Sequence, residues 1–126
     1  MFRKAKVPYT ENLGKTNRVV QETAIKGDIT SVADFRLDGE LIGNFTSQGK
    51  LVIGPKGRIV GDVTCVNLDI EGFFEGHISV QELLCVRATA SITGQVVVKQ
   101  LLVEPGAIFN ATCTMKQVEG ITSDGK

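Results

Sequence analysis

The side chains best suited to catalysis or metal binding are few, because the chain has one histidine and three cysteines. A zinc site with three histidine ligands is therefore excluded, which leaves His77 only as a lone base. Cys65, Cys85 and Cys113 contain no Cys-x-x-Cys pair. None of them has a histidine nearby in sequence that would activate a nucleophile. These residues predict no catalytic centre, no metal site and no cofactor.

Two further motifs resemble parts of enzyme sites. Asp28 and Asp62 would make a weak acid–base or metal pair, and a polar ladder on the surface explains them better. The turn at 54–57 reads Gly-Pro-Lys-Gly and lacks the spacing of a phosphate-binding loop. The enzymatic alternative is a β-helix of hexapeptide repeats, such as an acyltransferase or a carbonic anhydrase. This alternative is disfavoured because a repeat in the sequence has spacings of 15, 16 and 18 residues, and only 18 is a multiple of six.

Length and composition indicate one all-β domain. The 126 residues carry 14 basic and 14 acidic side chains, so the formal net charge is zero and nucleic-acid binding is not expected. Hydrophobic residues make up 42%, many of them β-branched, and 14 glycines supply turns. No apolar run approaches the roughly 20 residues of a membrane-spanning helix, and the odd cysteine count suggests a reducing compartment. We therefore expect a cytoplasmic protein.

A short pattern recurs along the chain: apolar, any residue, Gly, polar, apolar. The copies lie 15 to 18 residues apart and occupy residues 25–29, 41–45, 59–63, 74–78 and 92–96, with a degenerate sixth copy at 108–112. A coil of this length cannot bury its own apolar face, whereas stacked coils bury those of one another. The repeat predicts a β-helix (β-solenoid) of about six coils with short disordered termini. A β-sandwich is the less favoured alternative.

Stacking the copies assigns directions to individual side chains. The first inward column is expected to run from Ile25 to Ile108, which makes the neighbouring Phe109 point outward. Cys65 falls in an inward column, whereas Cys85 and Cys113 are expected to face outward. His77 occupies the outward slot that holds Asp62 one coil earlier, so a solvated surface residue is the simplest interpretation.

The ends of a solenoid expose backbone groups and a slice of core, which can pair with another chain. Neither flanking segment contains an obvious cap, so we expect end-to-end polymerisation. The alternative is that the tails fold back and cap a monomer. The residues expected at the polymer interface are Leu101, Val103, Ile108 and Phe109 at one end, and Val20, Ile25, Phe35 and Leu37 at the other.

The motifs together resemble the bactofilin family. They are the Ile-x-Gly-Asp-Ile repeat and the stretches 49–54, 67–72 and 103–107, within a match from about residue 23 to 115. The resemblance implies a right-handed β-helix that forms nonpolar filaments without nucleotide. It also implies scaffolds at the inner membrane that position cell-wall enzymes or other envelope proteins. His77, Gln95 and Asn110–Ala111 depart from the family pattern.

The first 18 residues carry five basic side chains and one acidic side chain, Glu11. Family members often begin with Met-Phe and basic residues that target the membrane, and this tail is similar. The residues expected to bind the membrane are Met1, Phe2, Arg3, Lys4 and Lys6. Basic side chains near an anionic leaflet contribute about 1 kcal/mol each. A disordered solubilising arm is the alternative.

The sequence thus predicts a basic tail at 1–18, a β-helix polymerisation domain at 19–116 and a disordered tail at 117–126. The expected function is a non-enzymatic bacterial cytoskeletal scaffold. Its expected partners are itself, the inner face of the cell membrane and envelope proteins. A monomeric or small-oligomer β-solenoid that binds other proteins is the main alternative, ahead of the hexapeptide-type enzyme.

Overall fold

A computed structural model describes residues 16–115, and these residues form a sheet of ten strands without any helix. Every strand pair is parallel, so each strand lies beside the strand one coil away. The strands are β1 (Thr16–Val19), β2 (Ala24–Lys26), β3 (Ile29–Ser31), β4 (Asp34–Leu37), β5 (Glu40–Ser47), β6 (Lys50–Ile53), β7 (Arg58–Ile70), β8 (Phe73–Val86), β9 (Ser91–Val103) and β10 (Ile108–Met115).

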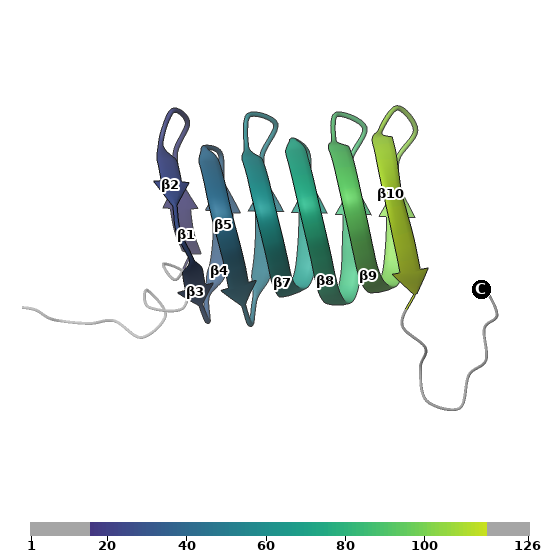
Figure 1. Cartoon of the computed structure of the whole chain (residues 1–126), viewed down its shortest axis with the longest axis horizontal. Helices are drawn as coiled ribbons and strands as arrows, with labels where there is room; N and C mark the ends of the chain where they lie inside the picture. The colour runs from purple at the N-terminus through teal and green to yellow at the C-terminus, as the bar shows by residue number, and fades with distance from the viewer. Residues whose placement is uncertain (1–15, 116–126) are drawn as a thin grey trace, which may run out of the picture.

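The chain winds into a solenoid of about six turns, which confirms the expected fold. In Figure 1 the near strands run downward and the far strands upward while the chain advances from left to right, so the coil is right-handed. One side, the long wall, contains β2, β3, β5, β10 and the first parts of β7, β8 and β9. The other side, the short wall, contains β1, β4, β6 and the last parts of β7, β8 and β9.

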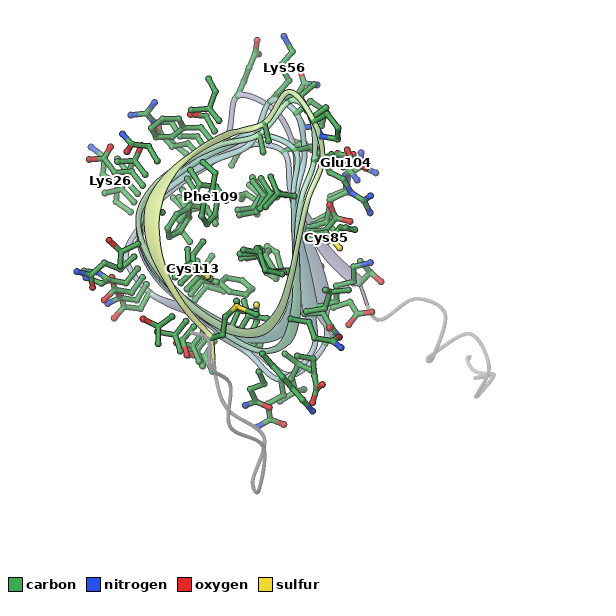
Figure 2. All side chains as sticks on the ribbon, turned by 90° about the vertical axis from the view of Figure 1, so that its right-hand side faces the viewer. Lys26, Lys56, Cys85, Glu104, Phe109 and Cys113 are labelled. Atoms are coloured by element: carbon green, nitrogen blue, oxygen red, sulfur yellow. The ribbon has the colours of Figure 1, made fainter. Side chains whose placement is uncertain are left out.

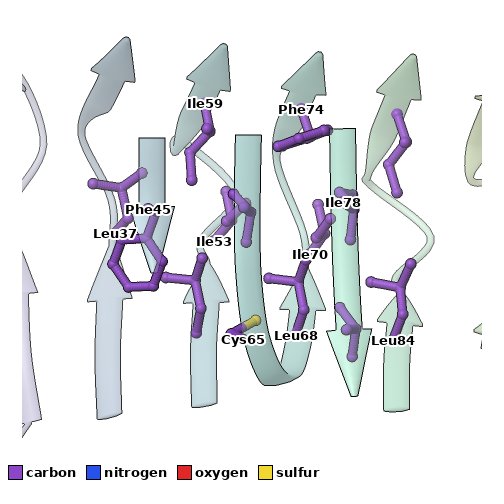
Figure 3. Packing of buried hydrophobic residues seen from close by; sticks show 14 of the residues in the cluster. Leu37, Phe45, Ile53, Ile59, Cys65, Leu68, Ile70, Phe74, Ile78 and Leu84 are labelled. Atoms are coloured by element: carbon purple, nitrogen blue, oxygen red, sulfur yellow. The ribbon is translucent and has the colours of Figure 1, made fainter. Parts of the chain in front are cut away.

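Inward side chains fill the solenoid as continuous columns because parallel pairing places each residue over its counterpart one coil away. On the short wall Leu37, Ile53 and Ile70 stack, and each is at most 1% exposed (Figure 3). On the long wall Ile59 and Phe74 stack in the same way, and both side chains are fully buried. Burying an aliphatic or aromatic side chain contributes roughly 1.5–3 kcal/mol each, so the columns supply the main stabilisation.

The last coil differs from the expectation by one residue. Phe109, not Ile108, stacks on Ile92, and Cys113 stacks on Val96. Phe109 and Cys113 therefore point inward against the core, whereas Ile108 is 61% exposed. The expected directions of these three side chains were wrong.

The physical reason for this shift is the corner that precedes β10. Tight turns close with hydrogen bonds from Gly57 N to Gly54 O, at 2.8 Å, and from Ala90 N to Arg87 O, at 2.9 Å. The corner before β10 makes the same turn, with Ala107 N donating to Glu104 O at 3.3 Å. In all three corners one more residue follows the turn before the inward column resumes. Ile108 occupies that linking position. Because its side chain is apolar, the sequence pattern alone assigns it to the core.

The first coil also begins earlier than expected, because β1 starts at Thr16, inside the segment 1–18 that was assigned to the tail. Val19 of β1 stacks on Leu37, and Asn17 stacks on Phe35. Leu37 is 1% exposed and Phe35 is 8% exposed behind this strand. These two expected interface residues are therefore covered core residues and do not form the N-terminal surface.

A column of glycines runs along the long wall and explains the Gly of the repeat. Gly43, Gly61, Gly76 and Gly94 have φ between 135° and 147°, a range that other residues rarely adopt. A Cβ added at Gly61 would also collide with the carbonyl oxygen of Gly43, one coil away. Gly27 begins the column with φ 136°, and nothing lies within 4 Å of a Cβ added there.

This contrast gives a matched pair of substitutions. Gly27→Ala should lower the free energy of unfolding by about 1–3 kcal/mol, because it introduces backbone strain alone. Gly61→Ala should cost clearly more, because strain and the collision with Gly43 act together. Chemical denaturation of both variants at one protein concentration measures the difference. Equal losses would show that close stacking of coils does not require the glycine.

Candidate functional site: the ends of the solenoid

The polar side chains of the long wall form a solvated ladder, as expected. His77 Nδ1 lies 3.1 Å from Asp62 Oδ1, and both side chains are more than 60% exposed. Two coils earlier in the ladder, Asn44 Nδ2 donates to Asp28 Oδ1 at 3.2 Å. Asp28 and Asp62 lie on either side of Asn44, which separates the two carboxylates along the ladder. Within residues 16–115 no group of three or more His, Cys, Asp or Glu could hold a metal ion.

The thiols are not arranged as nucleophiles. Cys65 is fully buried, as expected, and this burial raises the pKa of its thiol to about 12. Burial also raises the pKa of Cys113, which points into the solenoid (Figure 2). Cys85 lies on the outer side of the short wall, as expected, and is half-buried. Raised pKa values keep Cys65 and Cys113 as neutral thiols, which are poor nucleophiles.

The C-terminal end, residues 100–103 and 108–115, exposes a slice of the core. Phe109 and Cys113 project into the interior of the last coil in Figure 2, and no described strand lies beyond them. Inward positions continue to Val103 and Met115, which stack on Val86 and Val98 and remain 40% and 47% exposed. Among residues 16–115, each of these side chains has a stacked neighbour on one side only.

Outward side chains enlarge this apolar surface. Leu102 is 50% exposed and Ile108 is 61% exposed. Glu104 is the only charged residue between positions 100 and 115. Its carboxylate accepts hydrogen bonds from Arg87 Nη1 at 3.0 Å and Ala88 N at 2.9 Å. The C-terminal end is thus almost free of charge, and exposed apolar side chains gathered at one end of a molecule are typical of an interaction site.

The N-terminal end, residues 16–19 and 24–31, is closed by polar groups. Asn17 and Ser31 occupy inward positions, and Asn17 Nδ2 donates to Ser31 Oγ at 3.1 Å. The Ser31 hydroxyl also donates to Ala33 O at 3.2 Å and accepts from Ala33 N at 3.1 Å. These hydrogen bonds make the N-terminal end more polar than the C-terminal end, although the sequence predicted a cap at neither.

Charge also distinguishes the N-terminal end. Its exposed charged residues, with those of the adjoining turn, are Arg18, Glu22, Lys26 and Asp28. Val20 is 56% exposed and Ile25 is partly buried, so some apolar surface of the expected interface is present. The outer backbone edges of β1, β2 and β3 face no described strand and can still pair with another chain.

Part of this asymmetry was detectable in the sequence. Ser31 and Ser47 already stand one coil apart in an otherwise apolar column, which signals that the column becomes polar towards the N-terminus. Asn17 was missed because the repeat does not extend to it, and only its stacking on Phe35 reveals the inward position.

The expected membrane-binding residues Met1, Phe2, Arg3, Lys4 and Lys6 lie outside the described residues. Among residues 16–115 there is no helix with the length and apolar character needed to cross a membrane.

The sequence was compared with protein families, curated proteins and solved structures. The profile of one protein family, described as "Bactofilin: Polymer-forming cytoskeletal", matches residues 17–114. The matched range begins in β1 and ends in β10, so it includes both ends of the solenoid. No curated protein and no solved structure matches the chain.

The buried thiol predicts a pH dependence of stability. Above about pH 9 the unfolded chain loses the Cys65 proton, whereas the folded protein keeps it until about pH 12. Stability should therefore fall as pH rises through this window, by up to about 1.4 kcal/mol per pH unit. Cys65→Val removes this contribution, so denaturation curves of the two proteins should diverge only above pH 9. Parallel pH profiles would contradict the pKa shift.

Proposed function

Because the chain belongs to the bactofilin family of polymer-forming cytoskeletal proteins, we propose that it assembles end to end into nonpolar filaments without nucleotide. These filaments lie on the inner face of the bacterial cell membrane and act as a scaffold that positions cell-envelope proteins. The solenoid serves as a building block and carries out no catalysis.

The apolar slice at the C-terminal end, beyond which no described strand lies, carries this proposal. Val103, Met115 and Leu102 are each at least 40% exposed there. A second copy can bury these side chains at a gain of roughly 25 cal/mol per Å² of apolar area. The backbone edges of β10 and of residues 100–103 can pair with edges of the second copy in the same step. Side-chain burial and edge pairing therefore favour the same longitudinal contact.

Nonpolar order follows from the difference between the two ends. A C-terminal end set against an N-terminal end would bury apolar side chains against Arg18, Lys26 or Asp28, whose desolvation is costly. Like ends set together pair apolar surface with apolar surface and polar surface with polar surface. Such contacts are two-fold and self-complementary, and alternating them produces a filament without direction.

Assembly without nucleotide is supported by the corner at 54–57, the best match to a phosphate loop. Its backbone is engaged in the solenoid, with Gly57 N donating to Gly54 O and Gly54 N donating to Leu37 O. These amides are not free to surround a phosphate as those of a phosphate-binding loop are. Stacking of coils needs no ligand, so contacts between the ends can form without nucleotide.

Membrane association rests on the N-terminal tail. Met1 and Phe2 precede Arg3, Lys4 and Lys6. One tail carries few charges and binds weakly, whereas a filament presents many tails at once and binds by avidity. A membrane-bound filament would then offer its long polar sides as a surface on which envelope proteins dock.

Electron microscopy of negatively stained protein without nucleotide tests the filament. Val103→Arg places a charge on the C-terminal end and should abolish filaments or leave only short oligomers. Gln95→Arg lies on the same strand, β9, but its exposed side chain points outward, so this variant should still form filaments. Small particles of one size in the unaltered protein would reject the cytoskeletal role and favour the monomeric binding module.

Co-sedimentation with vesicles tests the membrane contact. Deleting residues 1–8 removes three basic side chains, worth about 3 kcal/mol per tail or roughly a hundredfold in affinity. Binding to vesicles rich in phosphatidylglycerol should fall accordingly, while filaments persist by microscopy. Lys4→Glu with Lys6→Glu should weaken binding in the same way. Undiminished sedimentation of both variants would remove the tail from the membrane contact.

A further inference from the structure

We infer that the two end contacts are unequal, so that the C-terminal ends pair first and the assembly unit is a tail-to-tail dimer. The N-terminal ends then join these dimers through a weaker contact. This inference rests on the proposed end-to-end assembly and specifies its order. The partner of each end is the same end of a second copy.

The C-terminal end has much to gain from a partner. Phe109, Val103 and Met115 point inward with no described strand beyond them, and Val103 and Met115 are at least 40% exposed. The outward-pointing Leu102 and Ile108 add further exposed apolar surface at this end. Glu104 is already engaged by Arg87 and Ala88, so pairing of two C-terminal ends leaves no carboxylate without a partner. Association there gains apolar burial with little loss of hydration.

The N-terminal end gains less and loses more. Asn17 and Ser31 already hydrogen-bond each other across the open core, so part of their hydrogen-bonding capacity is used before association. Arg18 forms an ion pair with Asp38 at 3.5 Å, and its side chain is 63% exposed. Burying this side chain at a contact would remove the water that hydrates its charge. At a two-fold contact the same charges of both copies also approach one another. Pairing of backbone edges remains as the principal gain.

The shape of the end supports the same order. Phe109, Leu101 and Cys113 pack against the core on their inner side, and β10 keeps its full register with β9 from Ile108 to Met115. The apolar surface is therefore held in place before association. Little ordering entropy is lost when two such ends meet, and this favours a tight contact.

Matched variants separate the two contacts. Asn17→Arg and Val103→Arg each place one arginine at an inward position of the outermost described short-wall strand, at opposite ends. Light scattering after size exclusion and sedimentation equilibrium give the mass of each variant across a dilution series. Circular dichroism and thermal melting establish that both variants fold.

Asn17→Arg should arrest as a dimer that persists on dilution. Val103→Arg should be a monomer at the same concentrations. Its remaining association should be weaker by about tenfold or more, equivalent to about 1.4 kcal/mol. Diluted filaments of the unaltered protein should shorten to dimers before monomers appear. Should Val103→Arg not fold, Met115→Arg replaces it, with Ser31→Arg as its N-terminal counterpart.

Other results overturn the inference in distinguishable ways. Filaments in the unaltered protein together with dimers of equal strength in both variants would retain the proposed function and reject the inequality. A dimeric Val103→Arg beside a monomeric Asn17→Arg would reverse the order. An unaltered protein that stays monomeric at every concentration would reject end-to-end assembly itself, and the inference with it.

Discussion

The close parallel stacking of successive coils is the constraint on which the rest of the structure depends. Each residue lies beside its counterpart one coil away, so an inward position must accept a side chain that packs against those of the neighbouring coils. Gly61 shows how strict this is, because even one added carbon would meet the carbonyl oxygen of Gly43. Repetition in the sequence is the direct consequence, since a position that suits one coil must suit its neighbours.

The same stacking makes the ends the chemically distinctive parts of the molecule. Along the sides, polar groups such as His77 and Asp62 pair across coils and face water. Coils can in principle be stacked without limit. Whether a second copy stacks on a solenoid therefore depends on the side chains and backbone edges of its terminal coils. Asn17 with Ser31 closes one end with hydrogen bonds, whereas Val103 and Met115 leave the other end apolar.

The solenoid could be predicted from the sequence because the same apolar and glycine positions recur in each coil, as stacking requires. Glycine spacing, the buried Cys65 and the outward His77 all follow from it. Prediction failed where the repeat weakens. Ile108 and Phe109 are both apolar, so only the turn at 104–107 decides which of them faces inward. Asn17 is polar and lies before the first recognisable copy, so neither its strand nor its closing hydrogen bond could be read from periodicity.

An ion-pair network explains how the last coil stays ordered although one of its sides has no described neighbour. Arg87 binds Asp69 through Nη2 at 2.8 Å and Glu104 through Nη1 at 3.0 Å, which ties together three successive coils on the short wall. Glu104 also begins the turn that leads into β10, and its second oxygen accepts from Ala88 N. The turn is therefore fixed from the preceding coils, and it determines that Phe109 faces inward. The ion pairs of Arg87 with Asp69 and Glu104 thus hold the turn that positions the apolar side chains of the C-terminal end.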